Sequence, residues 1–373
     1  NSIANDNIFI GSGTGLNNDF GQFNVFMGSD AGASNVSGIN NVYIGFMSGN
    51  TSTGNNNTYL GKSTGQVNTT GDQNTFLGSQ AGQSNTIAAN NTFVGATAGL
   101  DNTEGAANTF IGQGSGANNS TGSDNTFVGM TTGFVNTSGS MNTFLGKGAG
   151  DSNTTASGNT FMGALAGGAN TTAANNTFVG ANAGLLNSTG TGNTFMGKGA
   201  GDANTTAHDN TFIGTDAGGS NVTGTGNTFL GTAAGDVNTA SANTFLGANA
   251  GGANTSAADN TFIGTNAGLL NVTGVSNTFI GARAGDSNTA SGNTFIGKDA
   301  GGANTAGTLN TFIGSNSGAG NSTSTKNTFV GASSGQVNTG ELNTFIGANS
   351  GVANTGGDFN TFLGADAGME LSI

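Results

Sequence analysis

Residues 176–192 read NTFVGANAGLLNSTGTG, and variants of this stretch follow one another along almost the whole chain. The spacing from the start of one copy to the start of the next is 17, with four exceptions at 16. A short fixed period of this kind is the sequence signature of a repeat architecture, so the repeat decides the fold. The first Asn of each copy falls at positions 7, 24, 41, 57, 74, 91, 108, 125, 142, 159, 176, 193, 210, 227, 243, 260, 277, 293, 310, 327, 343 and 360.

The positions of the repeat, numbered from this first Asn, have sharply different residue preferences. Position 3 is aromatic in all 22 copies, position 4 is always Ile, Leu, Val or Met, and positions 5 and 9 are always Gly. Position 8 is Ala, Ser or Thr, and position 12 is Asn in 20 of the first 21 copies, with Ser52 as the exception. The 25 charged residues avoid all of these positions and position 2 as well. They recur at positions 6 and 10, which we expect to face solvent: Lys62, Lys147, Lys198 and Lys298, and Asp151, Asp202, Asp236 and Asp286.

A repeat of this length is too short for the helix pairs of helical repeat proteins, which need about 33 to 47 residues. The Gly and Asn content also opposes helix. Two short strands and two Gly-rich turns fit the length, because Thr-Phe-aliphatic is β-prone and Gly can adopt the positive φ angles of a tight corner. The sequence therefore predicts an all-β parallel β-solenoid of about 22 turns, forming a single repeat domain over residues 1–373.

Stacking such turns in parallel places identical positions about 4.8 Å apart, so that each position becomes a ladder. Phe then stacks on Phe, and a buried Asn side chain can donate to and accept from the Asn above and below it. The predicted structural ladder residues, taken from three typical turns, are Asn74, Phe76, Gly78, Gly82 and Asn85; Asn176, Phe178, Val179, Gly180, Gly184 and Asn187; and Asn260, Phe262, Ile263, Gly264, Gly268 and Asn271.

Adjacent residues of a strand point to opposite faces, so the ladders at positions 3 and 4 cannot both enter the narrow interior. One of them must face outward, and the sequence leaves open which. At about 1.5 to 3 kcal/mol for each side chain, an exposed row of 22 would leave roughly 30 to 65 kcal/mol of hydrophobic burial unused. This favours a homo-oligomer along the whole rod, with three subunits as the preferred number.

Composition excludes several partners. The chain has 71 Gly, no Pro, no Cys and a net charge of -13, with only six Lys and Arg to neutralise phosphates. Nucleic acid is therefore not an expected partner. No apolar run approaches the roughly 20 residues that span a bilayer, so we expect no membrane insertion by this chain.

A search for chemistry finds no catalytic, cofactor or metal site in the sequence. The single histidine, His208, lies in an expected loop without a nucleophile and orienting group around it. Gly197–Gly201 superficially resembles a phosphate loop, but no helix follows to present its N-terminus, so we read these residues as corner glycines. The Asp residues lack the spacing of calcium-binding β-rolls. Glycosylation sequons are present without being a strong signal, for example at Asn68, Asn153, Asn170 and Asn221.

The N-T-F-I-G and A-G-x-x-N-T elements resemble the repeats of bacterial and phage tail-fibre-like surface proteins. They are also similar to the head repeats of trimeric autotransporter adhesins. The resemblance implies a left-handed parallel β-roll that trimerises side by side and is carried on a cell or phage surface for attachment. The turn here departs from that pattern, because it is longer than the usual adhesin-head turn and carries Phe before the aliphatic residue.

The function that we expect is a non-enzymatic extracellular fibre or adhesin shaft. Its partners would be further copies of itself, with a surface receptor or glycan as a further partner. The alternative is an ice-binding solenoid, since Thr occupies position 2 in 19 of 22 turns and would form a regular rank. The bulky position 4 ladder on the same face counts against it. A polysaccharide-cleaving enzyme ranks third, because no pair of carboxylates repeats or clusters as that chemistry requires.

Overall fold

The structure is a computed structural model that describes residues 5–369. The chain divides into two compact units, Asn1–Thr191 and Gly192–Ile373. Each unit is a parallel β-solenoid with eleven short strands, one strand to a turn, and none of residues 5–369 is helical. The prediction of a parallel β-solenoid is therefore confirmed, and its strands recur at the spacing of the sequence repeat. The prediction of one domain over residues 1–373, like that of left-handed coiling, stays a prediction.

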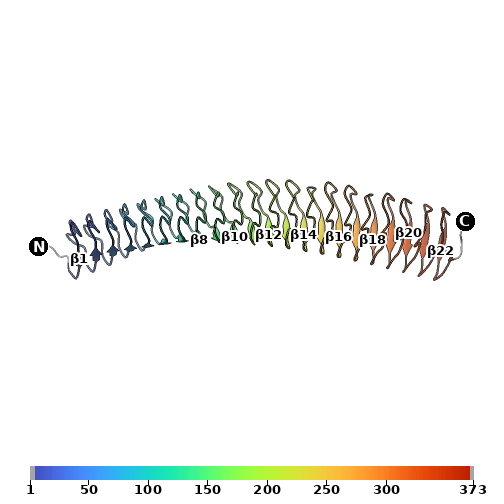
Figure 1. Cartoon of the computed structure of the whole chain (residues 1–373), viewed down its shortest axis with the longest axis horizontal. Helices are drawn as coiled ribbons and strands as arrows, with labels where there is room; N and C mark the ends of the chain where they lie inside the picture. Colours follow the sequence, from blue (N-terminus) through green and yellow to red (C-terminus); the bar gives the residue numbers. More distant parts are fainter. Residues whose placement is uncertain (1–4, 370–373) are drawn as a thin grey trace. The chain divides into compact units, whose positions relative to one another are not determined.

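Every strand is three residues long and covers positions 2 to 4 of the repeat. Figure 1 draws the strands as short arrows, one in each turn. The first unit contains β1 (Ile8–Ile10), β2 (Val25–Met27), β3 (Val42–Ile44), β4 (Thr58–Leu60), β5 (Thr75–Leu77), β6 (Thr92–Val94), β7 (Thr109–Ile111), β8 (Thr126–Val128), β9 (Thr143–Leu145), β10 (Thr160–Met162) and β11 (Thr177–Val179). The second contains β12 (Thr194–Met196), β13 (Thr211–Ile213), β14 (Thr228–Leu230), β15 (Thr244–Leu246), β16 (Thr261–Ile263), β17 (Thr278–Ile280), β18 (Thr294–Ile296), β19 (Thr311–Ile313), β20 (Thr328–Val330), β21 (Thr344–Ile346) and β22 (Thr361–Leu363).

Within each unit, each strand pairs in parallel with the strand of the next turn, and identical repeat positions lie side by side. In the first unit, β5 and β6 align Phe76 with Phe93 and Leu77 with Val94. In the second, β18 and β19 align Phe295 with Phe312. Only one of the two strands expected in each turn is present, because positive φ angles at several later positions interrupt the extended backbone there.

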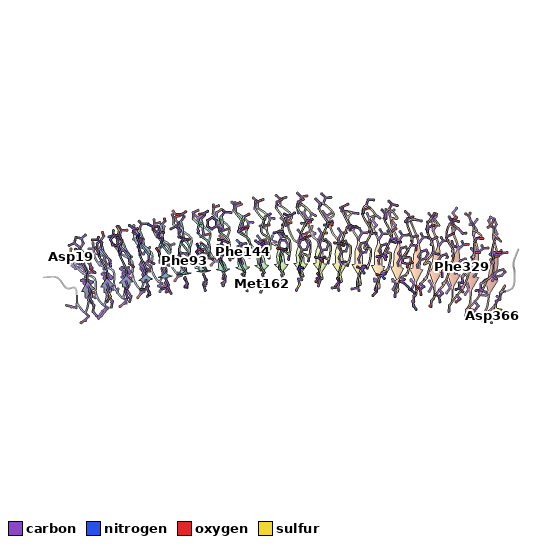
Figure 2. All side chains as sticks on the ribbon, viewed as in Figure 1. Asp19, Phe93, Phe144, Met162, Phe329 and Asp366 are labelled. Atoms are coloured by element: carbon purple, nitrogen blue, oxygen red, sulfur yellow. The ribbon has the colours of Figure 1, made fainter. Side chains whose placement is uncertain are left out.

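The aromatic ladder at position 3 fills the interior of both units. From β2 to β21 every one of these side chains is fully buried. Neighbouring rings stack nearly parallel, with centroids 4.6 to 5.1 Å apart in the first unit and 4.8 to 4.9 Å apart in the second. Phe93, Phe144 and Phe329 lie inside the coil, whereas Met162 at position 4 points away from it (Figure 2). The choice that the sequence left open is thus settled: the aliphatic ladder faces outward.

Two asparagine ladders run beside the rings, and they use their amides differently. At position 12 the side chains bond to one another, as expected: Asn85 Nδ2 donates to Asn68 Oδ1 at 2.8 Å. At position 1 the ladder instead passes through the backbone, since the N–H of Asn91 donates to Oδ1 of Asn74 at 3.0 Å. Within one turn, Asn74 and Asn85 both donate from Nδ2 to the carbonyl of Ala88 at position 15. The two amides therefore connect opposite sides of the turn across its interior, and their hydrogen bonds satisfy buried polar groups.

The two invariant glycines are required for different reasons. At position 5, a Cβ on Gly78 would lie 2.5 Å from the carbonyl oxygen of Gly95 in the next turn. At position 9, a Cβ on Gly82 would lie 2.5 Å from the ring of Phe76 in its own turn. Both also have positive φ, at 136° and 57°. The first glycine therefore allows close stacking of turns, and the second makes room for the aromatic ladder.

Position 7 and the last position of each turn also have positive φ, which the sequence did not reveal. Of the 36 non-glycine residues that have this conformation within residues 5–369, 17 are Asn or Asp, the types that tolerate it best. The others include Thr97, Leu165 and Phe359, with φ of 58° or 59°. The residue type alone therefore does not select the positive φ angle at these corners. Stacking against the neighbouring turns keeps the backbone in this conformation.

The shorter turns keep both ladders by shortening one loop. In the turn that begins at Asn227, Nδ2 of Asn227 and of Asn238 both donate to the carbonyl of Ala240 at 2.8 Å. This acceptor follows the position 12 Asn by two places in the sequence, whereas in a turn of the usual length it follows by three. The missing residue therefore falls between position 12 and the shared acceptor, outside the stacked core.

Within residues 5–369, the turn that begins at Asn41 contains the single departure from Asn at position 12, and a second departure compensates for it. Ser52 is shorter than Asn, and the hydroxyl of Tyr43 lies 2.8 Å from Ser52 Oγ. Asn68 Nδ2 of the next turn still donates to Ser52 Oγ at 3.2 Å. The phenol oxygen thus fills the space that an Asn amide would occupy, and it makes the polar contact that the amide would make. Burial raises the pKa of Tyr43 far above the ordinary range of a phenol, so the hydroxyl stays neutral.

We predict that Phe144→Ala destabilises the first unit by about 3–5 kcal/mol, because it removes one ring of a fully buried stack. Met162→Ala, in the next turn but on the outside, should cost only roughly 1 kcal/mol, since that side chain is 39% exposed. Chemical denaturation gives both values. Hydrogen exchange should accelerate in the turns around residue 144 for the first variant only. Equal effects of the two substitutions would contradict an inward aromatic ladder.

We also predict that Tyr43→Phe and Ser52→Asn are non-additive. Ser52→Asn alone crowds an amide against the phenol and should cost about 1–3 kcal/mol. The double variant restores the Phe and Asn of the other turns, so the two changes should show a coupling of about 0.5–3 kcal/mol in denaturation experiments. Additive effects would show that Tyr43 and Ser52 do not compensate for each other.

Candidate functional site

The outer surface of the strands is the most extended regular feature of each unit. It consists of the side chains at positions 2 and 4, which we call the strand face. Position 2 is Thr from β4 onward, and Ile8, Val25 and Val42 occupy it in the first three strands. Position 4 supplies Ile10, Met27, Ile44, Leu60, Leu77, Val94, Ile111, Val128, Leu145, Met162 and Val179 in the first unit. In the second unit it supplies Met196, Ile213, Leu230, Leu246, Ile263, Ile280, Ile296, Ile313, Val330, Ile346 and Leu363.

The aliphatic side chains of the strand face are only partly exposed. Leu60 is 43% exposed, Leu145 42% and Ile313 36%, because each packs against its copies in the turns before and after. The sequence-based estimate of unused burial assumed full exposure and is therefore too large. Others, such as Val94 and Ile263, are less exposed still. With about 40% of a side chain open, the unused part is roughly 0.6 to 1.2 kcal/mol per residue, so the eleven residues of one unit leave at most roughly 7 to 13 kcal/mol unused.

The strand face carries no charge, although the chain has a net charge of -13. Charged side chains lie elsewhere in the turn. Lys62 and Lys147 at position 6 are exposed, as predicted. The four Asp residues predicted to face solvent at position 10 are only half exposed, so the expectation that they point freely into solvent is wrong in part. Burial raises the pKa of all four, which are Asp151, Asp202, Asp236 and Asp286.

The ladder residues predicted from the three sample turns lie where the repeat requires them. The Asn and Phe residues of this set are buried, Val179 and Ile263 lie on the strand face, and the glycines have positive φ. Asn260 differs in one respect: its Oδ1 accepts from the N–H of Asn277, but its buried Nδ2 finds no hydrogen-bond partner among the described residues. These residues build the scaffold, and the outward aliphatic side chains are the ones that can meet a partner.

In the described residues, the weaker candidates of the sequence do not come together as a catalytic or binding site. His208 is exposed, and its carbonyl accepts from the N–H of Gly226. Gly197, Gly199 and Gly201 have positive φ and form a corner, with no helix behind them in the described chain. The four sequon asparagines, Asn68, Asn153, Asn170 and Asn221, belong to the position 12 ladder and are fully buried, so they are closed to glycosylation in the folded chain.

Three carboxylates from successive turns, those of Asp202, Asp216 and Asp236, form an acidic group. Burial is the main cause of the raised pKa of Asp202, and the neighbouring Asp216 and Asp236 add to it. Within residues 5–369, however, no group of three or more His, Cys, Asp and Glu side chains is arranged to hold a metal ion. This group therefore adds negative potential and builds no coordination sphere.

A cavity of about 320 Å³ opens in the first unit at a place that sequence reasoning missed. It lies between two neighbouring turns and is lined by Thr131, Phe134, Val135, Asp151 and Ser152. The one signal in the sequence is Phe134 itself, a Phe at position 10 where the other turns carry smaller or polar residues. The cavity brings an aromatic ring, a carboxylate and two hydroxyl groups together.

No protein-family model and no curated protein matches this chain. The resemblance to tail-fibre and adhesin repeats therefore rests on the repeat motifs alone. What the structure adds is the coarser feature, a parallel β-solenoid whose turns follow the period of the sequence. Residues 5–369 contain no helix at all, and so none that is long and apolar enough to cross a bilayer.

Proposed function

We propose that this chain is a non-enzymatic structural rod, a segment of an extracellular fibre or adhesin shaft, whose copies associate side by side through the strand face. The observation that supports the proposal is the uncharged strand face of each unit, with a partly exposed aliphatic side chain in every turn. A surface of this extent exceeds the scattered apolar residues that are normal on a monomer. The interior that could otherwise hold a ligand is filled by stacked rings.

A second copy of the same chain is the occupant that fits this face best. Its aliphatic side chains repeat once per turn, at the spacing of the strands, and only a partner with the same repeat can present matching side chains along the full length. Two acidic chains repel each other, so an uncharged contact surface is the one through which they can meet. Closing the face over one unit would recover much of the roughly 7 to 13 kcal/mol estimated above.

The finer parts of the proposal have separate support. Three subunits and a place on a cell or phage surface come from the resemblance of the N-T-F-I-G and A-G-x-x-N-T elements to tail-fibre and adhesin repeats. Side-by-side contact itself comes from the strand face. The proposed partners are further copies of the chain, and a receptor or glycan bound by the assembled fibre.

Ice binding is the second candidate, and one observation favours it. From β4 to β22, Thr at position 2 lies on the strand face in register from turn to turn within each unit. Such a flat, regular rank can order water. The aliphatic ladder beside it makes the face more apolar than a pair of Thr ranks would be, and we therefore rank self-association first. Thermal hysteresis measured on the monomeric fraction distinguishes the two candidates.

We predict that sedimentation equilibrium at micromolar concentration gives a homo-oligomer. Replacing the six outward residues of β4 to β9 by Thr should weaken association at least about a hundredfold, since it removes roughly 4 to 7 kcal/mol of apolar contact from each subunit. This set is Leu60, Leu77, Val94, Ile111, Val128 and Leu145.

The matched control replaces the position 6 residues of the same six turns by Thr, and it should leave association unchanged. These residues are Lys62, Ser79, Ala96, Gln113, Met130 and Lys147. A folded monomer of the unmodified chain would overturn the proposal. An equal loss of association in both sets would show that the contact does not run through the strand face.

A further inference from the structure

The cavity beside Phe134 lies where the turns before and after both have Gly at position 7. Position 7 is Gly114 in the turn before and Gly148 in the turn after. A Cβ on Gly114 would lie 3.5 Å from Cδ2 of Phe134, so the ring rests against a residue without a side chain. Phe134 is 38% exposed, although it is one of the largest apolar residues of the chain.

The carboxylate on the other side of the cavity belongs to Asp151, at position 10 of the next turn. The two turns are tied together by the backbone, since the N–H of Val135 donates to the carbonyl of Asp151 at 3.1 Å. Ser152 Oγ donates to Asp151 Oδ1 at 3.4 Å. The ring and the carboxylate are therefore held on neighbouring turns of a rigid scaffold.

Asp151 carries its charge in a half-buried place without a cation beside it. The ion pairs of the described residues join Arg283 and Lys298 to Asp299, so Asp151 takes part in neither. Burial is the main cause of its raised pKa, which indicates a carboxylate that water solvates incompletely. Incompletely solvated and unpaired, this charge gains from a cationic ligand more than a fully exposed one does.

We propose that this cavity binds an organic ammonium group, which lies against the Phe134 ring and pairs with the Asp151 carboxylate. An aromatic face attracts an ammonium through its quadrupole, most strongly where water is partly excluded. The hydroxyl groups of Thr131 and Ser152 accept hydrogen bonds from a ligand that still carries N–H groups. The net charge of -13 draws cations towards the surface as a whole.

The cavity is separate from the strand face, because its residues occupy positions 7, 10 and 11 of the turn, and the strand face consists of positions 2 and 4. In the sequence, a Phe at position 10 followed by an Asp at position 10 of the next turn occurs once, so the proposal gives one cation site for each chain. Two sources share the required chemistry: a free quaternary ammonium headgroup, and a lysine side chain of a partner protein.

The test is a titration of the full chain in which binding is monitored by NMR. The three ligands are choline chloride, Nα-acetyl-lysine N-methylamide, and 3,3-dimethylbutan-1-ol, which is the uncharged isostere of choline. At least one of the two cations should bind, and the isostere should bind about tenfold more weakly or not at all. Tighter binding of choline identifies a headgroup site, and tighter binding of the lysine derivative identifies a side-chain site.

Phe134→Ala and Asp151→Asn should each weaken binding of the cation by about tenfold, while circular dichroism and the melting curve confirm the fold. Asp236→Asn is the matched control, because Asp236 also lies at position 10 with a raised pKa but follows Gly219 at that position instead of an aromatic residue. It should leave binding unchanged. The proposal is overturned if neither cation binds, if the isostere or a neutral sugar such as cellobiose binds as well as choline, or if the two variants bind like the unmodified chain.

Discussion

Parallel, in-register stacking of each turn on the next is the constraint on which the rest of this molecule depends. It places every residue about 4.8 Å from its own counterpart, so a side chain is acceptable only if it packs well against a copy of itself. Phe rings do so by stacking, as between Phe76 and Phe93, and Asn amides do so by donating and accepting at once, as between Asn85 and Asn68. Charges of the same sign in neighbouring turns repel each other, which explains why the charged residues are confined to the corners and loops.

The same constraint separates the scaffold from the surfaces that can act. Side chains alternate along a strand of three residues, so the inward Phe leaves a Thr and an aliphatic residue outside. In the described turns the interior is filled by stacked rings and hydrogen-bonded amides. What remains available is the strand face, which repeats, and the few places where the repeat is broken, such as Phe134. A repeated surface suits a partner with the same period, and a single interruption suits a small ligand.

Much of the fold could be predicted, because stacking requires the same type of residue at the same position of every turn. The invariant Phe, Gly and Asn identified the ladders, and the lysines identified position 6 as exposed, whereas the aspartates at position 10 are less exposed than their charge suggested. The direction of the two apolar ladders could not be predicted, since both are hydrophobic. It depends on the room beneath the ring, which Gly82 provides for Phe76. The positive φ angles of Thr97 and Leu165 were equally hidden, because neighbouring turns impose them. The cavity could not be predicted either, because its one signal in the sequence, Phe134 at position 10, does not show that the neighbouring turn leaves space beside the ring.

The most direct test of this account is the distance between equivalent positions of distant turns. The chain contains no Cys, so pairs of spin labels can be placed without background. Lys62→Cys with Lys147→Cys spans five turns of the first unit, and Ser29→Cys with Lys147→Cys spans seven, all at exposed position 6. Pulsed electron paramagnetic resonance should give narrow distributions near roughly 24 Å and roughly 34 Å, in proportion to the number of turns. Broad distributions, or distances that do not grow by about 4.8 Å per turn, would contradict in-register stacking.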